Sequence, residues 1–212
     1  VHRADLEGTE AVLAGLGYAQ QYEELRPGAR TAFGSEDAWG KTVGALDVHI
    51  DLHWKPVGKI YGEMAWVWDH TEPWAMAGAA TRVFTPAVRL LYLAAHLALH
   101  HGQMASDDAL YLYYDIALMV RAADPALDWE AVLALAEAHR LAAPLQAVLR
   151  KAEAVWPLDL PEEVWAALAG IRTSRSDAQA VKVFTTEAEA RMDQYGGFWL
   201  SLGRYGSWRE RL

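Results

Sequence analysis

The sequence predicts an α+β protein in which a small strand-containing part, residues 1–84, precedes an all-helical part, residues 85–212. Two observations support this division. Polar and apolar residues alternate strictly over residues 47–54, which predicts a half-buried β-strand. From residue 85 onward, apolar residues recur at helical spacing instead. No internal repeat is visible, so we expect two unlike parts.

Composition and charge narrow the class of protein. With 212 residues, 53% of them hydrophobic and 22% charged, the chain is long enough for one large globular domain or two small ones. A net charge of −9 and the lack of a basic patch argue against nucleic acid as a partner, because its phosphates would be repelled. A sequence without cysteine excludes disulfides and thiolate zinc sites. There is no secretory signal and no apolar run of about 18 residues, so we expect a soluble cytoplasmic protein without a membrane partner.

The first segment has the signals of a short helix followed by extended chain. Asp5 is expected to cap this helix and Gly17 to end it, with apolar residues along one face between them. We then expect a strand over residues 18–25, a turn at residues 26–28 and a second extended passage over residues 30–42. The glycines expected to break this passage are Gly34 and Gly40.

The alternating segment 47–54 is the most informative stretch. Successive side chains of a strand point to opposite faces, so one set enters a core and the other lines the outer face. The expected core set is Val48, Ile50, Leu52 and Trp54, and the expected outer set is Asp47, His49, Asp51 and His53. Two carboxylates and two imidazoles on one face fit either a solvated strand face or a catalytic or metal-binding edge, and the residues alone leave both open.

The segment 56–84 is rich in tryptophan and is interrupted by proline and glycine. We expect a helix plus a loop that packs across the junction between the two parts. Core packing is expected for Trp66, Trp68 and Trp74, because an indole contributes a large buried area wherever it packs. Stacking of a nucleotide base on one of them is the alternative.

Helical signals begin at Thr85, which can cap a helix, and Pro86, which suits the first helical position. Residues 90–99 are apolar nearly all round, which predicts a central buried helix that is too short to span a bilayer. His96 and His100 lie four residues apart, at metal-ligand spacing, but no third ligand is evident. We therefore expect His96 to be buried, with its ring nitrogens bound by protein groups.

A second helix is expected to start near Ser106, with Asp115 off its apolar stripe. Cap and proline signals predict further helices behind it and an irregular docking segment at the end. These are a helix capped by Asp128, one behind Pro144 that ends near Trp156, one over residues 162–168, one over residues 177–192, and the docking segment 196–212.

Several of these segments resemble one family. Residues 48–54, centred on Asp51-Leu52-His53-Trp54, look like the VDLHW strand of the uncharacterised nucleotidyltransferase family of bacteria, distant relatives of DNA polymerase β-type transferases. The order and spacing of the matching pieces carry this resemblance, which extends over residues 5–160. The other matching pieces are Gly15-Leu16-Gly17-Tyr18, residues 90–101, Tyr113-Tyr114-Asp115-Ile116-Ala117 and Asp128-Trp129.

The resemblance implies an activity and a site. It implies transfer of a nucleotidyl group from a nucleoside triphosphate (NTP), with Mg²⁺, to an unidentified acceptor hydroxyl or phosphate. Asp51 matches the family's third carboxylate, so it is the expected catalytic residue and metal ligand, and we expect it to open on a cleft. His53, His100 and Asp115 are the expected substrate-binding residues. Asp115 either orients a histidine of the preceding helix or lies in solvent.

The family's first two carboxylates form an Asp-x-Asp pair that would precede Val1, so the strand-containing part is expected to be truncated. Asp5 and Glu7 have the spacing of such a pair, but their place at a helix start favours capping. One carboxylate cannot by itself hold Mg²⁺ and align a triphosphate. We therefore expect these 212 residues to bind Mg²⁺-nucleotide weakly and not to turn it over. The alternatives are a non-catalytic binding or scaffolding module and a helical interaction domain with an incidental strand motif.

Overall fold

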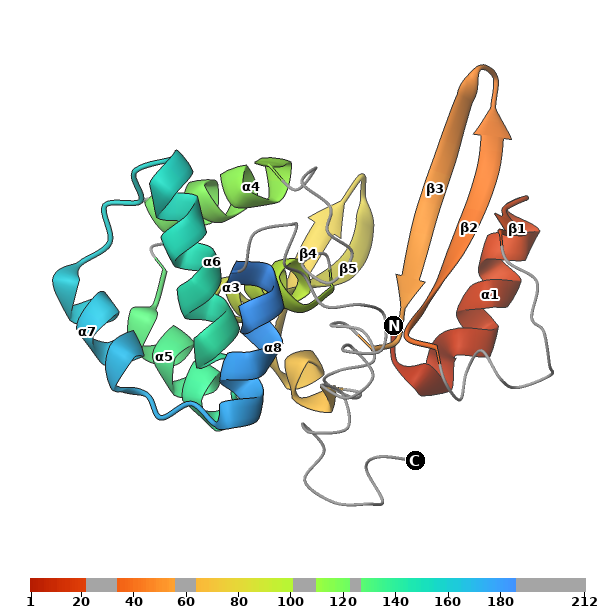
Figure 1. Ribbon diagram of the computed structural model, residues 1–212. Coiled ribbons are helices and arrows are strands. Elements are labelled where there is room, and N and C mark those ends of the chain that lie inside the picture. Colours follow the sequence, from red (N-terminus) through yellow and green to blue (C-terminus); the bar gives the residue numbers. More distant parts are fainter. Residues whose placement is uncertain (22–33, 56–63, 101–109, 123–126, 186–212) are drawn as a thin grey trace. The chain divides into compact units, whose positions relative to one another are not determined.

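The computed structural model describes residues 1–21, 34–55, 64–100, 110–122 and 127–185 (Figure 1). Within these ranges small antiparallel sheets are followed by helices, which confirms the α+β class. None of the helices in the described ranges is long and apolar enough to cross a membrane.

Two compact units make up the chain: an N-terminal unit, Val1–Met64, and a helical unit, Ala65–Leu212. The sequence prediction placed the division after residue 84. In the structure a β-hairpin over residues 71–84 groups with the helices instead. The second strand of this hairpin contacts the helical elements on either side of it in the chain, which accounts for the grouping.

The N-terminal unit contains a three-stranded antiparallel sheet and one α-helix packed on it. The strand order is β1-β2-β3, and β2 and β3 form a long hairpin (Figure 1). The elements are η1 (Arg3–Asp5), α1 (Leu6–Gly15), β1 (Ala19–Gln20), β2 (Glu36–Val43) and β3 (Leu46–His53).

Helix α1 lies where the sequence predicts it, but its expected cap is not formed. Asp5 occupies the N-cap position, yet its side chain accepts no capping hydrogen bond. The 3₁₀ turn η1 runs directly into α1, so the backbone of Asp5 is not in the extended conformation that suits a cap. At the other end Gly17 has a φ of 83°, a conformation that favours glycine. The Nζ of Lys41 donates to the Leu16 carbonyl at 2.6 Å and so satisfies this helix end.

The strands before β3 differ from their predicted limits. β1 is only two residues long, and residues 22–33 of the predicted strand, turn and extended passage lie outside the described residues. The expected break at Gly40 is wrong, because Gly40 lies inside β2 and pairs with His49. A Cβ at Gly40 would lie 2.5 Å from Nε2 of Gln21, so the glycine makes room for a side chain on the sheet.

The core of the N-terminal unit fixes which face of the sheet is inward. Leu6 and Leu13 of α1 pack against Trp39, Leu52 and Trp54, all of them buried. Large apolar side chains of this kind contribute about 1.5–3 kcal/mol each when fully buried. A shift of the strand pairing by one residue would move Leu52 and Trp54 to the solvent face, so burial of these side chains strongly specifies which face of β3 is inward.

The helical unit begins with a short helix and a hairpin, where the sequence predicted a helix plus a loop. The elements are η3 (Ala65–His70), β4 (Thr71–Met76) and β5 (Ala79–Phe84). Ala77 and Gly78 both have positive φ, 50° and 82°, as a two-residue type I′ turn requires. Alanine rarely occupies such a position, so the sequence carries a weak turn signal here.

The three tryptophans of this region have different environments. Trp66 is half-buried and stacks on His139 at 3.9 Å between ring centroids. Trp68 is half-buried and its ring lies 5.6 Å from that of Phe84. Trp74 is 57% exposed on β4, so the expectation that it packs in a core is wrong. A lone two-stranded hairpin has no second layer over both faces, which leaves such a side chain in solvent.

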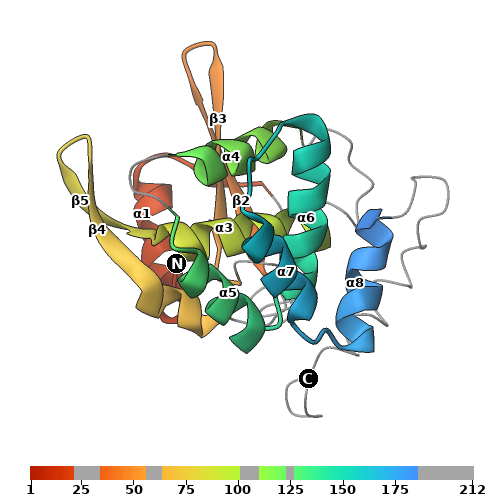
Figure 2. The ribbon, with the colours of Figure 1, turned by 90° about the vertical axis from the view of Figure 1, so that its left-hand side faces the viewer.

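The remaining elements form a helical bundle around a buried first helix (Figure 2). That helix begins at Pro86, and its residues Val88, Leu90 and Leu91 are fully buried, as the sequence predicts. It contacts α4, α5 and α6. The elements are α3 (Pro86–Ala95), the π-helical turn η4 (His96–His100), α4 (Leu110–Arg121), α5 (Trp129–Ala138), α6 (Ala142–Val155), α7 (Glu162–Gly170) and α8 (Arg175–Thr185).

The ends of these helices test the cap predictions. Asp128 caps α5 as expected, since its carboxylate accepts a hydrogen bond from the Ala131 amide at 3.0 Å. Thr85 occupies the N-cap position of α3 without a side-chain cap bond. The expected helix start near Ser106, the end of the last helix beyond residue 185 and the segment 196–212 lie outside the described residues.

Candidate functional site

Strand β3 carries the candidate site, and its two faces are as the sequence predicts. Leu52 and Trp54 are 6% and 1% exposed, and Val48 and Ile50 are half-buried on the same side. Asp47, His49 and Asp51 are exposed on the opposite side, where His53 is half-buried. The prediction of a strand with one polar face is therefore confirmed.

The residue opposite Asp51 on the neighbouring strand has a small side chain. This residue is Ala38 of β2. The Trp54 amide bonds to the Ser35 carbonyl, and because such pairs alternate along a hairpin, Ala38 and Asp51 form a non-hydrogen-bonded pair. Side chains in these pairs are about 4.5–5.5 Å apart at Cβ, so a small residue at 38 leaves the carboxylate accessible. The expected cleft beside Asp51 stays a prediction.

His53 is held by a residue that the sequence analysis missed. Glu36 lies directly opposite it on β2, and Oε2 of Glu36 is 3.0 Å from Nδ1 of His53. Both side chains are partly shielded from solvent: that of Glu36 is 36% exposed and that of His53 is 22% exposed. The contact fixes the orientation of the imidazole beside Asp51. The contact between Glu36 and His53 follows from the strand register, and the register could not be predicted from the sequence.

Asp47 cannot share a metal ion with Asp51. The two residues lie four positions apart on one strand, a span of about 13 Å at the rise of a β-strand. Asp47 instead accepts a hydrogen bond from Oγ1 of Thr42 at 2.8 Å. Among the described residues, no three histidine, aspartate or glutamate side chains lie close enough together to hold a metal ion. Any metal at Asp51 would need further ligands from substrate, water or another segment.

The edge of β3 that faces away from β2 receives the start of the chain. The Val1 nitrogen donates to the His53 carbonyl at 2.7 Å. Burial lowers the pKa of this amino group, and the negative charge of Asp5 acts in the opposite direction. Because backbone groups alternate in direction along a strand, the amide and carbonyl of Asp51 point to the same edge as the carbonyl of His53.

The other expected site residues belong to the helical unit. His96 is half-buried, not fully buried as predicted, and its ring lies 5.5 Å from that of Tyr92. His96 is the first residue of η4, in which Leu97, Ala98 and Leu99 fill the buried positions. His100 ends η4, and its side chain lies outside the described part. Asp115 is exposed on α4, and the described residues give it no hydrogen bond or ion pair. The structure thus groups Asp51 with His53, and places His100 and Asp115 in the other unit.

A second polar cluster in the helical unit was not foreseen. His70 lies beside the Trp66–His139 stack, with its Nδ1 2.9 Å from the Trp66 carbonyl. Burial lowers the pKa of His139, and the nearby charge of His70 lowers it further. Trp66 and His70 are four positions apart, but His139 lies about 70 positions further along the chain, so no local pattern could have revealed the whole cluster.

Comparison with known proteins gives one positive result. A family model described as an uncharacterised nucleotidyltransferase matches residues 1–157. The matched region includes Asp51, His53, His100 and Asp115. No curated protein and no solved structure matches the chain.

Proposed function

The chain belongs to the family of uncharacterised nucleotidyltransferases, and from this we propose that it transfers a nucleotidyl group from an NTP to an acceptor hydroxyl or phosphate. In this reaction a bond forms between the acceptor oxygen and the α-phosphorus, and the bond from that phosphorus to pyrophosphate breaks. The proton of an acceptor hydroxyl goes to a general base.

The exposed carboxylate of Asp51 is the observation that carries the proposal. It is an oxygen ligand of the kind Mg²⁺ uses, and no neighbour on its face in the described sheet is a lysine or arginine that would neutralise it. Mg²⁺ is usually bound through one or two carboxylates together with substrate phosphates and waters, so Asp51 fits as one ligand of a shared ion. Bound there, Mg²⁺ would offset charge on the reacting phosphates. Asp51 acts as this ligand or as the base for the acceptor.

His53 is the second residue of the proposed site. It lies two positions from Asp51 on the same face, about 7 Å along the strand. A triphosphate spans such a distance, so an imidazole held by Glu36 would meet phosphate oxygens while Asp51 meets the metal. The roles of His100 and Asp115 in substrate binding rest on the family resemblance alone.

A non-catalytic nucleotide-binding or scaffolding module is the second candidate. The observation in its favour is that the described residues contain no group of three histidine, aspartate or glutamate side chains that could hold a metal ion. A family member with one of three metal-binding carboxylates would keep the fold and lose most of the transition-state stabilisation that metal supplies.

The test combines MgATP and MgGTP calorimetry with a pyrophosphate-release assay. The protein is used at its native length, established by its intact mass. Asp51→Asn removes the charge at the site, and Asp47→Asn is the matched control, because it removes the same charge from the same face about 13 Å away. Pyrophosphate release that Asp51→Asn abolishes and Asp47→Asn leaves intact supports transfer. Binding without release supports the non-catalytic module. With a mass of 23.5 kDa we expect weak binding and no release. Release that is equal in both variants contradicts the assignment of Asp51.

A further inference from the structure

A groove lies between the first half of α6 and the middle of α8 in the helical unit. Its cavity has a volume of about 250 Å³. Small side chains form its walls, and their methyl groups leave the space unfilled. These residues are Ala143, Ala147, Ala178 and Val181.

Three polar side chains also line the groove: Gln146, Arg150 and Thr173. The described residues offer none of them a hydrogen bond, and no acidic side chain lines the cavity. The guanidinium of Arg150 lies over the Trp165 ring, with 5.1 Å between Cζ and the ring centroid. This contact restricts the guanidinium without using its N–H donors. In a chain of net charge −9, the groove is therefore a locally positive site with unused donors.

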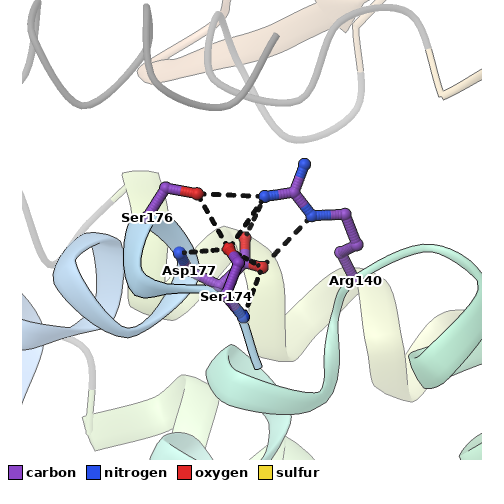
Figure 3. A network of polar contacts seen from close by, with 4 residues as sticks. All are labelled: Arg140, Ser174, Ser176 and Asp177. Carbon is purple, nitrogen blue, oxygen red and sulfur yellow. Dashed lines mark hydrogen bonds and ion pairs between the residues drawn. The ribbon is translucent and has the colours of Figure 1, made fainter. Parts of the chain in front are cut away.

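Helix α8 is attached at both ends, on either side of the groove. At its start, Arg140 donates to the buried Asp177 carboxylate from Nε at 3.1 Å and from Nη2 at 3.0 Å (Figure 3). Ser174 and Asp177 also bond reciprocally, side chain to backbone amide, as in a capping box. At the other end Nζ of Lys151 donates to the Phe184 carbonyl at 2.6 Å and lies 4.0 Å from the centroid of its ring.

These contacts fix the position of α8 beside α6. Asp177 is 4% exposed and satisfied by Arg140, so moving the start of α8 would break a buried ion pair. Lys151 belongs to α6 itself and ties the far end of α8 to it. The cavity between the two ends is therefore a preformed site, which reduces the entropic cost of binding a ligand.

We propose that the groove binds a small aliphatic carboxylate, a function separate from nucleotidyl transfer and independent of it. The planar fork of Arg150 matches a carboxylate, and Gln146 and Thr173 supply further polar contacts. The alanine methyls and Val181 suit a short apolar chain. Pockets for drug-sized ligands hold about 300–1,000 Å³, so a cavity of this size takes a smaller molecule. A single cation and an apolar wall favour a monoanion with a hydrocarbon part over inorganic phosphate.

The experiment is a titration of the full chain followed by two-dimensional NMR. Isovalerate carries both the charge and the branched apolar end, isovaleramide has the same shape without the charge, and acetate has the charge without the apolar end. We expect isovalerate to shift the signals of Ala147, Ala178 and the Trp165 indole with saturation. Isovaleramide should bind at least about tenfold more weakly because it lacks the charge that Arg150 would bind. Acetate should also bind at least about tenfold more weakly because it lacks the apolar end. Inorganic phosphate is the fourth probe and should not compete.

Two variants locate the site. Arg150→Gln removes the cation from an exposed position, and Ala147→Leu fills the cavity; each should weaken isovalerate binding at least about tenfold. Arg175→Gln is the matched control, because it removes an exposed arginine of α8 that does not line the groove, and it should leave binding unchanged. No saturable shift, equal binding of isovalerate and isovaleramide, competition by phosphate, or an Arg150→Gln variant that binds as well as Arg175→Gln would each overturn the proposal.

Discussion

Replacing Arg140 tests how much the attachment of α8 contributes to stability. Its guanidinium makes two hydrogen bonds to the Asp177 carboxylate and contacts the hydroxyls of Ser174 and Ser176 at 3.0 Å (Figure 3). Arg140→Ala removes the ion-pair partner of Asp177, which is 4% exposed, and leaves its contacts to Ser174 in place.

The expected cost follows from this geometry. Breaking a fully buried ion pair costs about 3–5 kcal/mol. The Arg140 side chain is 44% exposed and Ser174 still binds Asp177, so we expect about 2–3 kcal/mol, near the value for hydrogen bonds to a charged group. Arg140 also has a φ of 58°, which favours glycine over alanine by about 1–2 kcal/mol. Arg140→Gly should therefore be more stable than Arg140→Ala by about 1 kcal/mol.

Urea unfolding followed by far-UV circular dichroism measures both differences. The double variant Arg140→Ala/Asp177→Ala should cost less than the sum of the single changes, because the buried charge has been removed together with its partner. A cost for Arg140→Ala below about 0.5 kcal/mol, the usual range for a surface change, would refute the account of α8 as a helix held by this pair. Equal stability of the alanine and glycine variants would refute the role of the backbone conformation.

Three further predictions concern single sites. The pKa of His139 is lowered from 6.5 in the folded protein, so the unfolded chain takes up the proton at a higher pH than the folded chain. The free energy of unfolding should therefore keep its full value above about pH 6.5 and fall as the pH drops below it. Thermal unfolding at several pH values checks this, and His139→Phe should remove that part of the pH dependence. Ala38→Asp places a carboxylate opposite Asp51, so it should cost about 0.2–1 kcal/mol without metal and raise Mn²⁺ affinity in calorimetry, whereas Ala38→Asn should not raise it. Asp128→Ala removes the cap of α5 and should cost about 0.5–2 kcal/mol in urea unfolding; no change would contradict that cap.

The sequence predicted the limits and faces of β3, whereas for β2 it predicted only an extended passage with a wrong break at Gly40. Alternation reveals a strand when core positions are apolar, and in β3 they are Val48, Ile50 and Leu52. The core face of β2 instead includes Asp37 and Lys41. Both are accommodated by long-range hydrogen bonds, from Gln20 to Asp37 and from Lys41 to the Leu16 carbonyl. A local pattern carries no trace of such partners, so the limits and the register of β2 could not be predicted.

Among the site residues, too, contacts between residues far apart in the sequence could not be predicted. Asp51 and His53 could be found because they share one strand face with period two. Glu36 could not, because its contact with His53 depends on the register set by the turn at Gly44, which has a φ of 63°. Arg140 and Asp177 are 37 positions apart, and each alone looks like an ordinary surface charge. Only the packing of α8 brings them together.

The geometry around Asp51 decides where further metal ligands must come from. Mg²⁺ lies about 2.0–2.1 Å from each oxygen, so two carboxylates that share it must stand on adjacent positions. Along β3 the next carboxylate is Asp47, about 13 Å away, and across β2 the opposite residue is Ala38. A diagonal position on β2 is Glu36, which contacts His53. A further direction is the other edge of β3, to which the backbone of Asp51 points and where Val1 bonds to His53. A strand paired there would lie about 4.8 Å from β3, close enough for its outer-face carboxylates to share an ion with Asp51. If Asp51 holds a metal ion as proposed, we expect the further protein ligands to come from that edge or from Glu36.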